Sequence, residues 1–150
     1  EPEEEEEEPE GVLIDRVGDG RMYADVEGVA LVEGATADQG YILVSQQGVS
    51  AFNVYRRAAP HDFVVTFTVA ANEAAGVDAM TNTDGLAAVG TALGARFPRG
   101  LVVVHDDANE LPDGGTSDEA SFKLVSLGDV LGNDDKLLRD VGPDWDPRKF

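Results

Sequence analysis

Three acidic residues stand at related places in the sequence and are the strongest candidates for chemistry. Asp25 and Glu27 belong to an Asp-x-Glu-Gly segment, and Asp84 belongs to a Thr-Asp-Gly segment further along the chain. On a strand, side chains two residues apart lie on the same face, so Asp25 and Glu27 can act together. Grouped carboxylates repel each other unless a cation lies between them, and oxygen ligands without His or Cys suit Ca²⁺. The sequence therefore predicts a calcium site held by these carboxylates.

An internal repeat connects these acids. Residues 24–30 (ADVEGVA) resemble residues 82–88 (NTDGLAA), and in both an acid and a glycine precede an apolar strand. Residues 40–45 and 100–105 then correspond, followed by residues 50–55 and 120–125, and the offset grows from 57 residues between Glu27 and Asp84 to 60 and then 70 residues. Because Asp before Gly is also an ordinary turn residue, this recurrence favours the metal site more than any single spacing does.

Other catalytic chemistries find less support in the sequence. There is no cysteine, and neither of the two histidines, His61 and His105, has the i+4 partner of a zinc-protease helix. The serines lack a nucleophile-elbow pattern, and the glycines do not form a phosphate-binding loop. Residues 106–115 also lack the spacing of an EF-hand calcium loop.

The charge of the chain bears on its partners. It carries 30 Asp and Glu against 11 Lys and Arg, a formal net charge of −19. Such a surface repels nucleic acid and anionic membranes, which bind clustered Lys and Arg, so neither is expected as a partner. Eight of the acids lie in residues 1–10, which we expect to form an acidic disordered linker. No apolar run reaches the roughly 18–20 residues of a membrane span.

The remaining sequence is typical of an all-β fold. Short segments rich in Val, Ile, Leu and Phe alternate with Gly, Asp and Asn, which predicts strands separated by turns. We expect strands over residues 12–17, 29–33, 41–45, 51–56, 63–69, 86–89, 101–105 and 121–126, with one short helix around 130–138. Three or four strands per unit, repeated at somewhat more than 50 residues, indicate β-propeller blades of four antiparallel strands.

This repeat predicts two blades, over residues 11–70 and over residues 71–150 with a C-terminal closing segment. Propellers typically need about four to eight blades, so two cannot close a ring. The chain is therefore part of a larger propeller, several copies assemble into one, or the chain is a fragment, which is the interpretation we favour. Because the first strand of each blade lines the central channel, Asp25, Glu27 and Asp84 would meet at one mouth of it.

Several segments together resemble a known family. From about residue 12 to residue 150 the chain is similar to the end of the β-propeller phytases, in the segments ADVEG, GYILVSQQGVSAFNVYRR, VDAMTNTDGLAAVG, FPRGLVVVHDDAN, SFKLVSLGDV and DPRKF. The resemblance implies the last two blades of a six-bladed propeller. It also implies a secreted, extracellular, calcium-dependent phosphomonoesterase that acts on phytate (inositol hexakisphosphate).

The resemblance also assigns roles to residues. Asp25, Glu27 and Asp84 would hold an active-site Ca²⁺ cluster, and they could serve as a base for a bound water. Asp78 would ligate a separate, stabilising Ca²⁺, with further ligands from the loop around Asn109. Ala108 stands where the family often has a Glu ligand, so either Glu110 or Asp113 replaces it or the site is weaker.

The basic residues with which the family holds its substrate lie in earlier blades, so we expect the 150-residue chain to be inactive alone and to need the remaining blades, in cis or in trans. Two alternatives stay open. One is a non-catalytic, calcium-binding propeller domain. The other is an interaction module whose two-blade chains trimerise into six blades.

Overall fold

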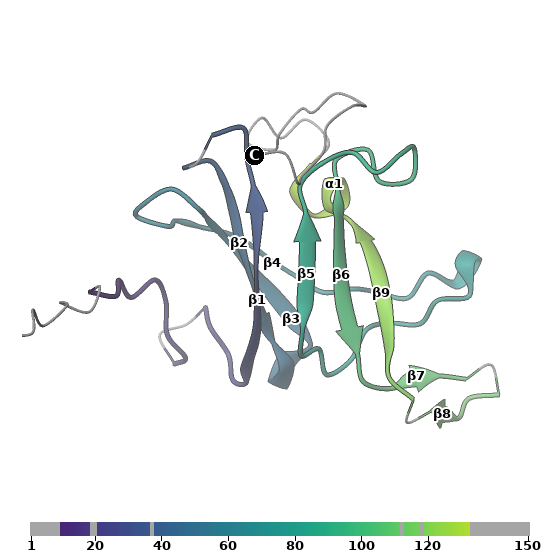
Figure 1. The fold of residues 1–150 in the computed structure, drawn as a ribbon. Helices are drawn as coiled ribbons and strands as arrows, with labels where there is room; N and C mark the ends of the chain where they lie inside the picture. Colours follow the sequence, from purple (N-terminus) through teal and green to yellow (C-terminus); the bar gives the residue numbers. More distant parts are fainter. Residues whose placement is uncertain (1–9, 19–20, 37, 112, 118, 133–150) are drawn as a thin grey trace, which may run out of the picture.

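The fold is described by a computed structural model that covers residues 10–18, 21–36, 38–111, 113–117 and 119–132 (Figure 1). It is built almost entirely of antiparallel strands, which confirms the all-β prediction. The first sheet has the order β1-β2-β3-β4, with strands Val26–Glu33, Gly40–Gln46, Ala51–Arg56 and Phe63–Phe67. It has the four strands expected of a propeller blade.

The second sheet has the order β5-β6-β9, with strands Leu86–Val89, Leu101–Asp106 and Ser121–Ser126. A separate hairpin of β7 (Asn109–Glu110) and β8 (Thr116–Ser117) lies between β6 and β9 in the chain. This hairpin accounts for the larger offset of the last repeated segment. Within the described residues the second sheet therefore has three strands, at the positions predicted from the sequence, and one fewer than a propeller blade of four strands.

Two further elements differ from the sequence prediction. Residues 12–17 form no strand and make only a single bridge, from Val17 to Met22, because no other strand edge pairs with them in the described structure. The helix α1 covers Leu127–Leu131 and thus begins before the predicted position, while residues 133–138 lie outside the described residues. Short 3₁₀ turns, η1 (Gln47–Val49) and η2 (Glu73–Ala75), complete the elements. No helix in the described ranges is long and apolar enough to cross a membrane.

The backbone confirms the repeat at two glycines. Gly40 opens β2 with a φ of +117°, and Gly100 precedes β6 with a φ of +114°. A Cβ atom at either position would collide with a backbone carbonyl oxygen of the preceding strand, that of Val32 for Gly40 and that of Val89 for Gly100. Both turns thus demand glycine for the same two reasons, the backbone conformation and the space.

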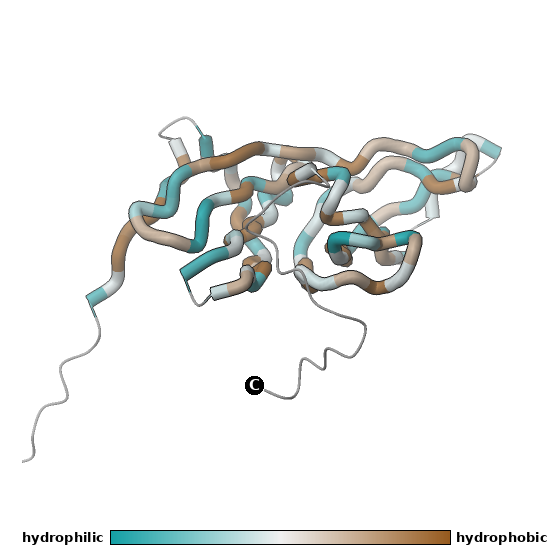
Figure 2. The backbone as a smooth tube through the Cα atoms, turned by 90° about the horizontal axis from the view of Figure 1, so that it is seen from above, coloured by the Kyte–Doolittle hydropathy of each residue, from teal (hydrophilic) through white to brown (hydrophobic). Residues whose placement is uncertain are grey.

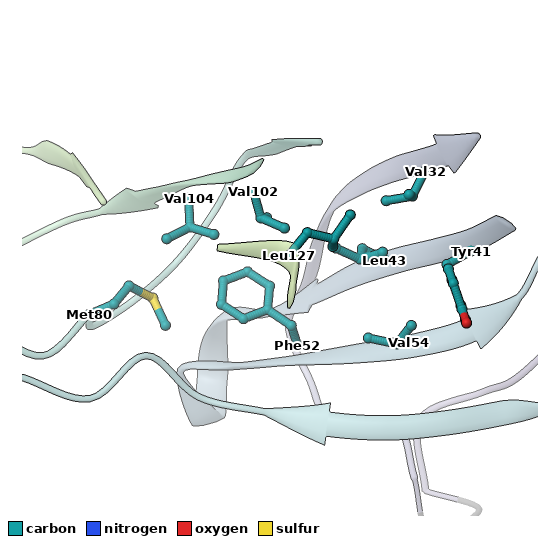
Figure 3. Close-up of a cluster of buried hydrophobic side chains, with 9 residues drawn as sticks. All are labelled: Val32, Tyr41, Leu43, Phe52, Val54, Met80, Val102, Val104 and Leu127. Atoms are coloured by element: carbon teal, nitrogen blue, oxygen red, sulfur yellow. The ribbon is translucent and has the colours of Figure 1, made fainter. Parts of the chain in front are cut away.

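The two sheets lie side by side (Figure 2), and their facing sides form one apolar core (Figure 3). Phe52 of β3 stacks on Phe67 of β4 with 4.8 Å between ring centroids. The fully buried residues of this core come from both sheets and from α1: Val32, Tyr41, Leu43, Phe52, Val54, Val102, Val104 and Leu127. The core therefore fixes the two sheets against each other.

In the part of the chain that the structure describes, the far side of the second sheet is open. Its residues are the repeat equivalents of those that the first sheet buries in the core. Phe122 corresponds to the buried Phe52 but is 70% exposed, and Leu124 corresponds to the buried Val54 but is 58% exposed. The first sheet thus shows how such a face is covered: by a neighbouring sheet.

A segment that precedes β1 covers part of the opposite side of the first sheet. The Tyr55 hydroxyl donates a hydrogen bond to Asp15 Oδ2 at 2.7 Å, and the Arg21 guanidinium lies over the Phe63 ring at 4.8 Å from its centroid. Burial, together with the Asp15 hydrogen bond, raises the pKa of Tyr55 to about 12, so the hydroxyl stays a donor at neutral pH. On β1 itself, Val29 and Leu31 remain exposed.

We predict that Gly40→Ala destabilises this chain by more than about 2 kcal/mol, since it adds a backbone collision to the strain of a positive φ. Chemical denaturation gives the free energy of unfolding. Gly94→Ala is the matched control, because Gly94 also has a positive φ (+87°) but open space around its Cβ position. Strain alone should cost the control about 1 kcal/mol. Equal losses in the two variants would contradict the collision argument.

Candidate functional site

The predicted site lies at the first strand of each sheet, β1 and β5, which we call the inner strands. Asp25 directly precedes β1, Glu27 is the second residue of β1, and Asp84 lies two residues before β5. Figure 1 shows β1 and β5 next to each other and running in the same direction, so these acids lie at the same end of the inner strands.

A buried serine joins the two strand entries. Ser45 Oγ accepts a hydrogen bond from the Gly28 N–H at 2.7 Å and donates one to the Asp84 carbonyl oxygen at 2.6 Å. Gly28 permits this approach, because a Cβ atom there would lie only 2.7 Å from the same carbonyl oxygen. The strand bearing Glu27 and the segment bearing Asp84 are thereby tied together.

The carboxylate of Asp84 is contacted from both sheets. The Gln47 side-chain amide, from η1 of the first sheet, donates to Asp84 Oδ1. On the other side, His105 Nδ1 of β6 lies 3.3 Å from Asp84 Oδ2. The Gln47 backbone N–H also donates to the Asp25 carbonyl oxygen at 2.8 Å. One short turn thus positions residues at the entries of both inner strands.

Asp25 and Glu27 are exposed, and within the described structure their carboxylates make no hydrogen bond or ion pair. Their oxygen chemistry, with that of Asp84, fits Ca²⁺. However, no three His, Asp or Glu side chains among the described residues come together as a group that could hold a metal ion. Since Ca²⁺ takes about six to eight oxygens, these carboxylates would form only one part of a calcium site.

Asp78 and Asn109, the predicted ligands of a stabilising Ca²⁺, are bonded within the protein. Asp78 Oδ1 lies 2.8 Å from Lys123 Nζ, and Asp78 Oδ2 accepts the Glu110 N–H at 2.6 Å. The hydrogen bond from Lys123, followed by that from Glu110, lowers the pKa of Asp78. Asn109 accepts a hydrogen bond from the Ser121 hydroxyl at 2.7 Å. The positive charge of Lys123 beside Asp78 disfavours a calcium ion at this carboxylate, and the stabilising site stays a prediction.

The two residues considered as substitutes for a ligand at Ala108 have different surroundings. Glu110 has an exposed side chain, and its backbone N–H bonds to Asp78. Asp113 Oδ1 accepts the Gly115 N–H at 3.0 Å inside the turn of the β7–β8 hairpin. Neither residue joins a metal-binding group in the described structure.

Sequence reasoning missed a buried ion pair beside this region. Lys123 Nζ contacts Asp106 Oδ2 as well as Asp78, while Lys123 is 5% exposed and Asp106 is fully buried. Burial alone would lower the pKa of Lys123, but its bonds to both carboxylates outweigh burial and raise it. A signal was present in the repeat, since the equivalent residues of the first sheet, Gln46 and Asn53, are also polar and also buried.

The amino-acid sequence of this chain is similar to those of known proteins. The phytase family model matches residues 1–150. A 3-phytase of Bacillus subtilis (strain 168) is 30% identical over 136 residues, which cover 89% of this chain and 34% of the relative. The chain belongs to the phytase family, which confirms the resemblance. It spans about a third of the length of that relative.

We predict that Ser45→Ala lowers the free energy of unfolding by about 1–3 kcal/mol, because it leaves the buried Gly28 N–H without its acceptor and the Asp84 carbonyl without its donor. Equilibrium denaturation of both proteins measures the difference. Ser126→Ala serves as the control, since the Ser126 side chain makes no capping bond at α1. A loss no larger than that of the control would show that Ser45 does not tie the strand entries.

Proposed function

We propose that this chain is part of a calcium-dependent phytase, which hydrolyses the phosphomonoesters of phytate. One observation carries the proposal: in a member of the phytase family, Asp25, Glu27 and Asp84 occupy related repeat positions at the joined entries of two inner strands. Acids at the ends of neighbouring inner strands are suited to a metal site at one mouth of a propeller.

The charge of the substrate explains why carboxylates need a metal here. Phytate is a polyanion, which a chain of net charge −19 would repel. Bound Ca²⁺ would reverse the local charge and lower the pKa of a coordinated water. Among the described residues the carboxylates of Asp25 and Glu27 have no partner and are available as ligands, while Gln47 donates to the Asp84 carboxylate and His105 lies beside it. These residues would hold the metal and could take up a proton from its water; none would act as a covalent nucleophile.

We further propose that the chain works within a six-bladed propeller whose other blades cover its open faces. The buried core between the two sheets supports this, because the open side of the second sheet repeats the residues that the first sheet buries. The span of about a third of the related 3-phytase agrees with two blades of six. The other blades would also complete the ligands and supply cationic groups for the substrate. By analogy with the family, we propose an extracellular location for the whole protein.

A second candidate function is that of an interaction module that assembles with copies of itself. Since the side of the first sheet that carries the exposed Val29 and Leu31, and the open side of the second sheet, correspond to the two sides of the internal core, one chain could pack on the next, and three would make six blades. The mass of the chain in solution distinguishes the cases: a monomer supports blades supplied in cis, and a trimer supports self-assembly.

For the longer protein, we predict that Asp84→Ala combined with Glu27→Ala abolishes calcium-dependent phosphate release from phytate, because two metal ligands are lost. The matched control is Glu33→Ala, which removes an exposed acid at the other end of the same strand β1 and should leave the rate within about twofold. Unchanged release by the double variant would reject the site.

The 150-residue chain alone should release little or no phosphate from phytate with Ca²⁺ present. Release approaching that of the longer protein would contradict the proposal that this chain needs the remaining blades.

A substitution on the open face tests the remaining blades. In this chain Phe122→Ala should change the free energy of unfolding by less than about 0.5 kcal/mol, since the ring is 70% exposed. In the longer protein the same change should cost about 3–5 kcal/mol, because the ring would be buried like Phe52. Val12→Ala, at an exposed residue with no buried repeat equivalent, should have little effect in either protein. Equal effects of Phe122→Ala in both would argue against a covering blade.

A further inference from the structure

The second sheet contains a buried cluster of charges centred on one ammonium group. Lys123 of β9 lies between Asp106, at the end of β6, and Asp78, in the segment before β5. Lys123 and Asp106 are almost completely buried, and the Asp78 side chain is only 15% exposed. The cluster thus joins two strands of the sheet to the segment that leads to Asp84.

The cluster satisfies its own polar atoms. Asp106 Oδ1 accepts the Thr81 N–H at 2.7 Å, and Asp106 Oδ2 accepts from Lys123. Asp78 shares its two oxygens between Lys123 and the Glu110 N–H. Buried charges are tolerated where they are paired and hydrogen-bonded, and removing one member leaves the others uncompensated. The two carboxylates therefore depend on the single cation between them.

The first sheet contains a neutral version of the same arrangement. There the Tyr23 N–H donates to Gln46 Oε1 at 2.7 Å, as the Thr81 N–H donates to Asp106 in the second sheet. The Asn53 amide then donates to the Arg21 carbonyl oxygen at 2.7 Å, in the place where Lys123 reaches Asp78. In both sheets, side chains of the second and third strands hold the segment that enters the first strand. Only the second sheet does this with charges.

These contacts leave little room for a metal ion at Asp78. The Lys123 ammonium, 2.8 Å from Asp78 Oδ1, would repel a Ca²⁺ ion bound to the same carboxylate, and Asp78 Oδ2 already accepts the Glu110 N–H. Asn109 Oδ1 accepts from Ser121, and Ala108 supplies no carboxylate. The position that the family resemblance assigns to a stabilising Ca²⁺ instead has a cation of its own.

We propose that the Lys123 ammonium takes the place of a stabilising calcium ion in the second sheet. The ammonium balances Asp78 and Asp106 and thereby holds the segment of residues 78–81 on the sheet without a metal. The proposal concerns this cluster alone, so it stands or falls separately from the calcium site of Asp25, Glu27 and Asp84.

The test compares thermal unfolding of the chain in excess Ca²⁺ and in excess EDTA, for the parent and for Asp78→Asn. Calcium bound at Asp25, Glu27 and Asp84 would affect both proteins alike, so only the difference between their responses reports on Asp78. We expect the shift of the unfolding midpoint between Ca²⁺ and EDTA to agree within about 1 °C in the two proteins. A calcium-dependent rise in the parent that Asp78→Asn loses would overturn the proposal. Asp113→Asn is the control for removing one acid from the adjacent hairpin.

A second variant tests the cation itself. Lys123→Met keeps much of the aliphatic side chain and removes the charge, so we expect its unfolding midpoint in EDTA to fall by at least about 10 °C. Failure of this variant to fold would agree with the proposal, while the comparison of the parent with Asp78→Asn remains decisive. A midpoint in EDTA within about 2 °C of the parent's would show that the ammonium is not the stabilising cation.

Discussion

The close approach of β1 and β5 is the contact on which the rest of the structure depends. It requires a glycine at position 28 and a buried hydroxyl at Ser45, which bonds to both strand entries. The apolar core holds the sheets in the same relation from the other end of the strands, with Val32 of β1 fully buried in it. If this contact opened, the core would lose its facing partner and the candidate carboxylates would separate. The packing of the core and the grouping of the carboxylates therefore both require that β1 and β5 stay in contact.

The repeat made much of the fold predictable. The short apolar segments Tyr41–Ser45 and Ala51–Arg56 and their counterparts, separated by turn residues, predicted strands that the structure contains, and the glycines at 40 and 100 occur at equivalent turns. Residues 12–17 misled the prediction because β-forming residues make a strand only where a partner edge exists, and tertiary structure decides that. The β7–β8 hairpin was likewise hidden, since its strands contain only two residues each.

The candidate site was predictable in part. The recurrence of acids before the inner strands identified Asp25, Glu27 and Asp84, and the structure places them at one end of those strands. Sequence could not show that Gln47 and His105 contact Asp84, because Gln47 reaches it from the other sheet and His105 from a strand 21 residues further along the chain. It also could not show that Asp78 faces Lys123, since a lysine in a strand is ordinarily an exposed residue. An acid at a repeat position therefore identifies a candidate ligand, and its neighbours in space decide whether it is available.

The turn η1 has a consequence for how this protein can vary. Gln47 bonds through its backbone to Asp25 and through its side chain to Asp84, so a single residue connects the entries of both sheets. A shift of one sheet against the other, caused by any substitution along their shared core, would move the two acids relative to each other. Substitutions that only change the packing at Phe52 or Val102 would thus also change the distance between the two acids. In such an arrangement, selection for the spacing of the two acids also acts on the interior of the protein, so that core residues would vary less than their distance from the acids suggests.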